Sequence, residues 1–265
     1  AILVMSFVFV PVTAQKPKRL IFDDEFNGAA NSSADSTKWT AEIGGGGWGN
    51  KELEYYTDST ANAYQDGSGS LVIKAIPVSS LMSLTCWYGP CKYISARLKT
   101  KGKFDVKYGR FEARIKIPRG QGVWPAFWLL GSDIGTVGWP QCGEIDIMEN
   151  IGREPAVVHG TVHGPGYSGA NGIGSPYKWQ NGAFADDFHV YAVNWSADEI
   201  RWYVDGKQYK TLKLSDLPAS TKWVFDHPFF LIINFAVGGT WPGDPDDTTA
   251  FPQIMEVDYV RVYGK

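Results

Sequence analysis

Apolar and polar residues alternate along most of the chain, with the period of two that is typical of a strand with one buried face. In YGRFEARIKI, residues 108–117, the charged residues fall on one side and the apolar residues on the other. Residues 196–199 and Asp205-Gly206 are turn signals between strands. No long segment has helical periodicity, although residues 214–220 suggest a single helical turn. Similar strand patterns occupy residues 71–75, 93–100, 125–130, 156–163, 189–195, 200–206, 229–239 and 256–264.

Many antiparallel strands without helices predict a sandwich of two sheets. We therefore expect an all-β fold, a β-jelly roll of two curved antiparallel sheets with a cleft on the concave face. A chain of 265 residues is ample for one such domain. The sequence has no repeats, charge blocks or low-complexity linkers, which favours a single domain over residues 15–265.

Residues 1–14 have the pattern of a secretory signal and are left out of the predicted domain. An apolar run of ten residues leads to Val12, Thr13 and Ala14, which place small residues at a cleavage site after Ala14. The run is too short to span a membrane. A buried N-terminal strand is the alternative. We expect a signal peptide remnant at residues 1–14, a secreted protein and no membrane partner.

Charge and composition narrow the classes of partner. The net charge is −3 and the pI is near 5.8, with no basic block, so we expect no nucleic-acid partner. The chain has 11 Trp and 13 Tyr, which suit a core and also a surface that stacks on the apolar faces of sugar rings. The Gly-rich loops at 44–50, 164–174 and 238–245 lack the Lys-Ser/Thr ending of a phosphate-binding loop. We interpret these loops as walls of a groove.

Two of the three cysteines are close in sequence. Cys86 and Cys91 are separated by the turn-like Trp-Tyr-Gly-Pro, which favours a small-loop disulfide in a secreted protein. The alternative is a pair of zinc ligands, but the chain lacks further cysteines and a clear histidine pair. The remaining Cys142 is interpreted as a buried thiol with a packing role.

The segment EIDIME, residues 144–149, places three acids in an apolar strand. Glu144 and Asp146 are two residues apart and share a face, whereas regular alternation would send Glu149 to the opposite face. A β-bulge near Ile147 and Met148 would restore the phase and turn all three carboxyl groups into one cleft. One of the two bulge neighbours would then face the core together with Ile145.

Three neighbouring carboxyl groups cannot all be ionised easily, so the pKa of at least one is raised. A protonated acid beside an ionised carboxylate is what glycoside hydrolysis requires. A solvated strand face and a calcium site are the alternatives. The neighbouring tryptophans, His159 and His163 fit a sugar-binding cleft better, because calcium prefers oxygen ligands from a compact loop.

At these residues the sequence resembles glycoside hydrolase family 16, the laminarinase-like β-glucanases. The family signature Glu-x-Asp-x-x-Glu is present as EIDIME. The resemblance implies a retaining double displacement with Glu144 as nucleophile, Asp146 as assisting acid and Glu149 as acid/base, and no cofactor for catalysis. Other matching segments occupy residues 22–28, 48–57, 95–104, 108–131, 159–169, 188–195, 234–243 and 255–263.

The resemblance also implies a set of sugar-binding residues. Aromatic residues that shape the subsites before the cleaved bond correspond to Trp124, Trp128 and Trp139; the alternative for Trp128 is a core position next to Phe127. His163 resembles a cleft histidine close to the acid/base, and His159 is the weaker candidate. Polar and aromatic groups on the non-reducing side correspond to Asn50, Arg97 and Trp241, and Asn234 is expected to line the cleft. Arg97 could equally form a surface salt bridge, and Asn234 could be a buried amide.

Members of the family often carry a structural calcium ion away from the cleft. Its side-chain ligand corresponds to Asp258, with backbone oxygens near Glu25 and Gly69 completing the site. Asp258 alternates with Val260 and Val262, so we expect an apolar neighbourhood in which an acid needs a partner or an ion.

The resemblance therefore implies a secreted, monomeric endo-β-1,3-glucanase that hydrolyses laminarin-type β-glucans. The first alternative is a β-1,3/1,4-glucanase or another polysaccharide hydrolase of the family. The second is a non-catalytic β-glucan recognition module, which is disfavoured because both glutamates are present.

Overall fold

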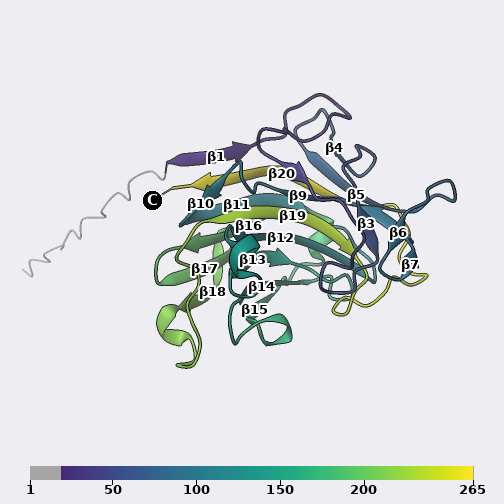
Figure 1. Ribbon diagram of the computed structural model, residues 1–265. Helices are drawn as coiled ribbons and strands as arrows, with labels where there is room; N and C mark the ends of the chain where they lie inside the picture. The colour runs from purple at the N-terminus through teal and green to yellow at the C-terminus, as the bar shows by residue number, and fades with distance from the viewer. Residues whose placement is uncertain (1–18, 265) are drawn as a thin grey trace, which may run out of the picture.

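The computed structural model describes residues 19–264. Two large sheets packed face to face dominate this part of the chain (Figure 1). The predicted signal peptide lies outside the described residues. One sheet has the strand order β18-β17-β16-β11-β20-β5-β8-β3, with β1 and β4 paired at its side, and the other has the order β15-β14-β13-β12-β19-β9-β2, with β10 paired to β19. The pairing is antiparallel except between β3 and β8. The predicted all-β jelly roll is confirmed.

The strands have the following bounds. The ten-stranded sheet contains β1 (Leu20–Asp24), β3 (Glu54–Tyr56), β4 (Ala63–Gln65), β5 (Leu71–Pro77), β8 (Tyr93–Ser95), β11 (Gly109–Lys116), β16 (His189–Trp195), β17 (Glu199–Val204), β18 (Lys207–Lys213) and β20 (Gln253–Tyr263). The eight-stranded sheet contains β2 (Thr40–Ala41), β9 (Arg97–Lys99), β10 (Asp105–Val106), β12 (Val123–Gly131), β13 (Glu144–Glu149), β14 (Val157–His163), β15 (Ile173–Lys178) and β19 (Phe229–Val237).

A small hairpin and a few helical turns complete the described chain. They are β6 (Thr85–Cys86), β7 (Gly89–Pro90), α1 (Ile134–Val137), η1 (Gly169–Asn171), η2 (Phe184–Asp186) and η3 (Leu214–Asp216). The helical turn predicted within residues 214–220 is confirmed by η3. No helix among residues 19–264 has the length and apolar character needed to cross a bilayer.

The prediction of one strand over residues 93–100 is wrong. β8 pairs with β3 and β5 in one sheet, whereas β9 pairs with β19 and β2 in the other, and the chain crosses between the sheets at the fully buried Ala96. Alternation continues through the crossing, so periodicity could not reveal it. The polar strand β18 was also missed, because only Leu212 in it is buried.

The main core lies between the sheets and is built by the inward-facing residues of each strand. Each large apolar side chain that is fully buried there stabilises the fold by about 1.5–3 kcal/mol. β19 is buried along its whole length, because its outward side is covered as well. There Phe230 and Ile232 pack with Leu130 and Cys142 in a smaller cluster. The predicted packing role of the Cys142 thiol is confirmed.

The predicted disulfide between Cys86 and Cys91 is also confirmed, and it closes the β6–β7 hairpin. The hairpin is fastened to the segment before β3. Trp87 Nε1 donates a hydrogen bond to the Glu52 carbonyl at 2.7 Å, and Tyr88 Oη donates one to the Leu53 carbonyl at 2.6 Å. The disulfide therefore braces one end of the sandwich.

Trp202 of β17 ties the two sheets together at the acidic strand. Its buried indole Nε1 crosses the core and donates a hydrogen bond of 2.7 Å to the Asp146 carbonyl of β13. Gly160 of β14 leaves room for this indole, because a Cβ atom there would lie 2.4 Å from Trp202 Cδ1.

We expect Trp202→Phe to lower the free energy of unfolding by about 1–3 kcal/mol, because the buried Asp146 carbonyl loses its donor. Trp223→Phe is the matched control, since the buried Nε1 of Trp223 has no hydrogen-bond partner among residues 19–264. Urea denaturation of both variants would measure the difference. Equal losses in the two variants would contradict this role of Trp202.

Candidate active site

The predicted bulge is present in β13. Toward β12, Trp128 pairs with Asp146 and Phe127 pairs with Met148, so Ile147 is the extra residue. Toward β14, the register likewise shifts between Asp146 and Glu149. Both Ile147 and Met148 are buried in the main core, so the expectation that only one of them would face inward is wrong.

The bulge brings the three acids to the outer face of the eight-stranded sheet. Asp146 is only 3% exposed, and Glu144 and Glu149 are half-buried. The alternative of a solvated strand face is therefore excluded. On the neighbouring β14, the residues opposite the acids are His163, Thr161 and His159.

Each glutamate is held by a different indole. Trp139 Nε1 donates a hydrogen bond of 2.9 Å to Glu144 Oε2, and Trp124 Nε1 donates one of 3.1 Å to Glu149 Oε1. An indole is a donor without a net charge, so it orients a carboxyl group without forming an ion pair with it. Two of the three predicted subsite tryptophans thus contact the acids directly.

His163 lies beside Glu144 and Asp146 rather than beside Glu149. Its Nε2 is 3.2 Å from Asp146 Oδ2 and 3.6 Å from Glu144 Oε1. The charge of His163 also acts on Glu149, in line with the expectation that His163 lies close to the acid/base, although the strand register places His159 directly opposite Glu149. His159 in turn pairs with Glu154 at 3.1 Å.

Arg97 occupies the centre of an aromatic group on the same face. Its guanidinium carbon lies 4.7 Å from the centroid of the Trp48 ring and 4.8 Å from that of Trp128, in cation–π geometry. Arg97 also forms a salt bridge with Glu42, which pairs with Lys99 too. The salt-bridge alternative for Arg97 is therefore confirmed, and its role in binding sugar hydroxyls stays a prediction. Trp128 lies on this outer face and not in the main core.

Polar residues connect the aromatic group to the inside of the fold. Trp128 Nε1 donates a hydrogen bond of 2.7 Å to Asn234 Oδ1, and Asn234 Nδ2 donates one of 3.1 Å to Tyr56 Oη. Asn234 is 5% exposed, so the alternative of a buried, hydrogen-bonded amide describes it well. Asn50 donates a hydrogen bond to Glu52 at 3.0 Å.

Trp241 forms the side of the site nearest Glu149. Its ring contacts those of Trp124 and His159 edge to face, with centroids 5.4 Å and 5.0 Å away. The loop that carries Trp241 is joined to the Asn50 loop, since Thr240 N donates a hydrogen bond to the Asn50 carbonyl at 2.8 Å. The structure therefore brings Asn50, Trp124 and Trp241 to one side of the acids.

Comparison with known proteins agrees with this geometry. The sequence description of the family named "Glycosyl hydrolases family 16" matches residues 48–261. The chain belongs to this family. It is therefore a glycoside hydrolase, and the non-catalytic alternative is set aside.

Three relatives illustrate the similarity. The chain is 43% identical over 251 residues to a "Beta-glucanase" of Rhodothermus marinus, covering 92% of this chain and 84% of that protein. It is 43% identical over 262 residues to "Glucan endo-1,3-beta-glucosidase A1" of Niallia circulans, covering 92% of this chain but 37% of that longer protein. The solved laminarinase catalytic domain of Thermotoga maritima MSB8 is 50% identical, with a TM-score of 0.85 over 94% of this chain and 98% of that one.

Burial dominates the electrostatics of the family 16 acids. It raises the pKa of Glu149 well above its ordinary value, and repulsion from Asp146 adds to the shift. Burial raises the pKa of Glu144 to about 8, while the charge of His163 and the hydrogen bond from Trp139 act in the opposite direction. Burial also raises the pKa of Asp146 to about 8. The cluster therefore retains protons at neutral pH. A general acid must hold such a proton before it can donate it to a leaving group.

Glu144, Asp146 and His163 also offer ligand atoms within 4.8 Å of one another. His163 Nδ1 is buried and has no hydrogen-bond partner in the described part of the chain. The same residues include the family's acidic signature, and Trp139 already donates to Glu144. Catalysis in this family needs no cofactor.

Two residues of the calcium site inferred from the resemblance, Asp258 and Glu25, pair with arginines through their side chains. Asp258 Oδ2 lies 2.7 Å from Arg114 Nη1, and both Glu25 oxygens accept hydrogen bonds from Arg261. The expectation of an apolar neighbourhood for Asp258 is wrong, because a bulge in β20 leaves its side chain 36% exposed beside Arg114. Calcium bound by Asp258 with backbone oxygens of Glu25 and Gly69 stays a prediction.

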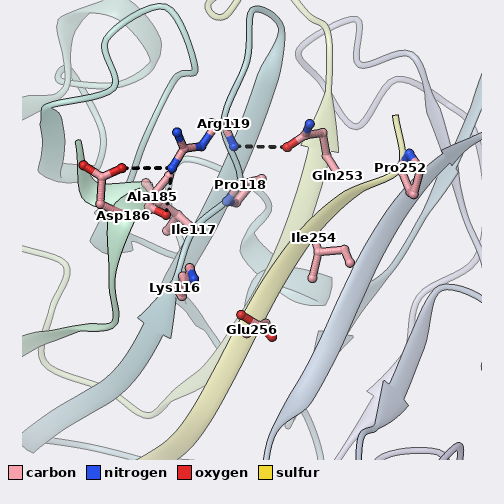
Figure 2. Close-up of a pocket in the computed structure, with 10 residues that line it drawn as sticks. All are labelled: Lys116, Ile117, Pro118, Arg119, Ala185, Asp186, Pro252, Gln253, Ile254 and Glu256. Carbon is pink, nitrogen blue, oxygen red and sulfur yellow. Dashed lines mark hydrogen bonds and ion pairs between the residues drawn. The ribbon is translucent and has the colours of Figure 1, made fainter. Parts of the chain in front are cut away.

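A hollow of about 450 Å³ lies on the other sheet, where β11 ends and β20 begins. Figure 2 shows the residues that line it. Two of its charged groups pair with each other, Arg119 with Asp186 at 2.9 Å, and the Arg119 backbone N–H donates a hydrogen bond to Gln253. None of the predicted site residues lines it. The hollow is therefore separate from the acidic face of β13.

Sequence reasoning missed Trp48, Glu42 and Tyr56. Trp48 and Tyr56 stand in the segment 48–57 that carried the resemblance, so that segment was the available signal. Glu42 had none, because its partner Arg97 is 55 residues away in the chain.

Proposed function

We propose that this family 16 hydrolase is an endo-β-1,3-glucanase that cleaves laminarin-type β-glucans with retention of configuration. The observation that carries the proposal is the bulge that places Glu144 and Glu149 on one face, each held by its own indole. The aromatic group around Arg97 supplies flat surfaces for glucose rings. Relatives named laminarinase and glucan endo-1,3-beta-glucosidase support the choice of linkage.

In the proposed reaction, Glu149 donates its proton to the glycosidic oxygen while a Glu144 oxygen attacks the anomeric carbon. The bond to the leaving sugar breaks, and a covalent glycosyl–Glu144 ester forms. Glu149, now ionised, takes a proton from water, which attacks the same carbon and releases Glu144. His163 lies next to Glu144, and its charge favours the ionised form in which Glu144 leaves. A charged Asp146 would disfavour that form, so in this scheme Asp146 holds a proton close to His163.

We also propose that the protein is secreted and acts as a monomer. The signal-like pattern of residues 1–14 supports secretion. The closed Cys86–Cys91 disulfide supports it independently, since disulfides persist in oxidising compartments.

Replacement of either glutamate should stop hydrolysis without preventing binding. We expect Glu144→Gln and Glu149→Gln each to lower kcat on laminarin by at least about 10³-fold, because each step loses its nucleophile or its acid. Reducing-sugar release would be measured on laminarin, lichenan, agarose and carrageenan, with laminarin binding as the control for folding. Full activity in either variant, or preferred cleavage of a galactan, would contradict the proposal.

The stereochemistry of the first product tests the covalent step. A double displacement inverts the anomeric centre twice, so the freshly released reducing end should be the β anomer. Proton NMR of laminarioligosaccharide hydrolysis, recorded before mutarotation, would show which anomer forms first. Initial α anomer would exclude Glu144 as a nucleophile.

The two indole donors should control opposite limbs of the pH profile of kcat/KM. Trp139→Phe removes a hydrogen bond to ionised Glu144 and raises its pKa further, by about 0.5–1 unit for a bond worth about 1 kcal/mol. Because the nucleophile must be ionised, activity would then be lost at a higher pH on the acid side. Trp124→Phe raises the pKa of Glu149, which must be protonated, and so moves the alkaline limb upward. The two variants are controls for each other, and a shift of the same limb in both would contradict these roles.

A further inference from the structure

Glu52 and Glu54 form a second group of acids, buried behind the aromatic group of Arg97. Glu52 is 3% exposed and Glu54 is fully buried. The two side chains are close enough for a hydrogen bond between their carboxyl groups, and such a bond acts on the pKa of both. Two carboxylates have no donor between them, so one of the pair must carry a proton.

The surroundings indicate that Glu54 carries the proton. Burial, followed by the charge of Glu52, raises the pKa of Glu54 well above its ordinary value. Glu54 Oε2 accepts a hydrogen bond of 2.7 Å from the Val237 backbone N–H, while the buried Oε1 accepts from no donor in the described chain. A proton on Oε1 would satisfy that atom and would be donated to Glu52.

Glu52 is surrounded by donors. Asn50 Nδ2 donates to Oε1 at 3.0 Å, and Tyr56 Oη donates to Oε2 at 3.2 Å. With the proton of Glu54, three donors therefore point at one carboxyl group. Arg97 also acts electrostatically in favour of its ionised form, against the burial that raises its pKa. An ionised carboxylate, which only accepts, fits this set.

We propose that Glu52 is a positioning residue for glucan binding: as a buried acceptor supported by neutral Glu54, it orients the polar and aromatic side chains that line the Arg97 side of the site. This inference rests on the proposed function. Glu52 would not contact the sugar, since it acts through Asn50 and Tyr56.

In the contacts that begin at Glu52, the direction of each hydrogen bond sets the direction of the next. Because Tyr56 gives its only proton to Glu52, its oxygen is left to accept from Asn234 Nδ2. That contact fixes which end of the Asn234 amide is the oxygen, and the oxygen faces Trp128 Nε1. The Trp128 ring then packs against the Arg97 guanidinium. With a donor in place of Glu52, Tyr56 would accept a hydrogen bond there and would donate its own proton to Asn234. The Asn234 amide would then no longer need to present its oxygen to Trp128 Nε1.

The acids of β13 are held by a separate set of donors, Trp124 and Trp139. Loss of Glu52 should therefore weaken substrate binding more than it slows bond cleavage. A purely structural role would instead reduce stability and leave the KM of the folded fraction unchanged.

The test compares Glu52→Gln with Glu54→Gln, which differ only in which acid becomes an amide. The amide of E54Q mimics a neutral acid, because it still donates to Glu52 and accepts from Val237. The amide of E52Q has one acceptor oxygen for two donors, so its N–H₂ group must face Asn50 or Tyr56. We expect E52Q to raise the KM for laminarin about 10-fold with kcat within about 3-fold, and E54Q to keep both within about 2-fold. An unchanged KM in E52Q, or an equal rise in both variants, would overturn the inference.

Two further measurements separate this inference from the proposed function. In the E144Q background, calorimetric binding of laminarihexaose should be about 10-fold weaker with E52Q and unchanged with E54Q. If the wild-type protein neither cleaves nor binds β-1,3-glucan, the proposed function fails. Crystal structures of E52Q and E54Q then decide the positioning role: Tyr56, Asn234 or Trp128 should move only in E52Q, and unmoved side chains there would overturn it.

Discussion

The site depends on one extra residue in β13. A strand presents alternate residues to the same face, so the five-residue step from Glu144 to Glu149 would otherwise separate the two carboxyl groups by the thickness of the sheet. Ile147 is the extra residue of the bulge, and both Ile147 and Met148 are buried in the core. A bulge leaves the strand locally short of ladder partners, and here the Trp202 indole supplies a donor to Asp146. Gly160 on the next strand leaves room for that indole.

Tryptophan serves this protein as a hydrogen-bond donor at least as much as a stacking surface. Trp124 and Trp139 hold the two glutamates, Trp128 holds Asn234, and Trp202 holds the bulge. A lysine or arginine in the same places would lower the pKa of each carboxyl group by pairing with it. The indole orients the acid and lowers the pKa of the carboxyl group only through one hydrogen bond. The raised pKa values of the cluster can therefore persist although both glutamates have partners.

The features that the sequence predicted well are those set by local spacing. The alternation of β11 and β13 and the bulge follow from residues that are adjacent in the chain, and the Cys86–Cys91 loop is equally short. The errors arise where distant strands meet. The close contact of His163 with Glu144 and Asp146 likewise depends on the register of β13 and β14, which no local pattern encodes. The break at Ala96 was hidden because alternation continued across it, and the bulge at Asp258 depends on the pairing of β20 with β11.

Burial has the same effect on the acids of β13 and on the pair Glu52 and Glu54, but the two groups differ in what their protons can reach. In each, burial favours the neutral carboxyl, and a proton is retained where two acids lie close together. The group on β13 is open to the outer face, so a retained proton there can be passed to a substrate. The group at Glu52 and Glu54 is closed, because Tyr56 and Asn234 lie between it and the aromatic group. A proton held there cannot reach a sugar, and it is available only to fix the direction of the hydrogen bonds that end at Trp128. Access, rather than pKa, thus separates a catalytic carboxyl group from a positioning one in this fold.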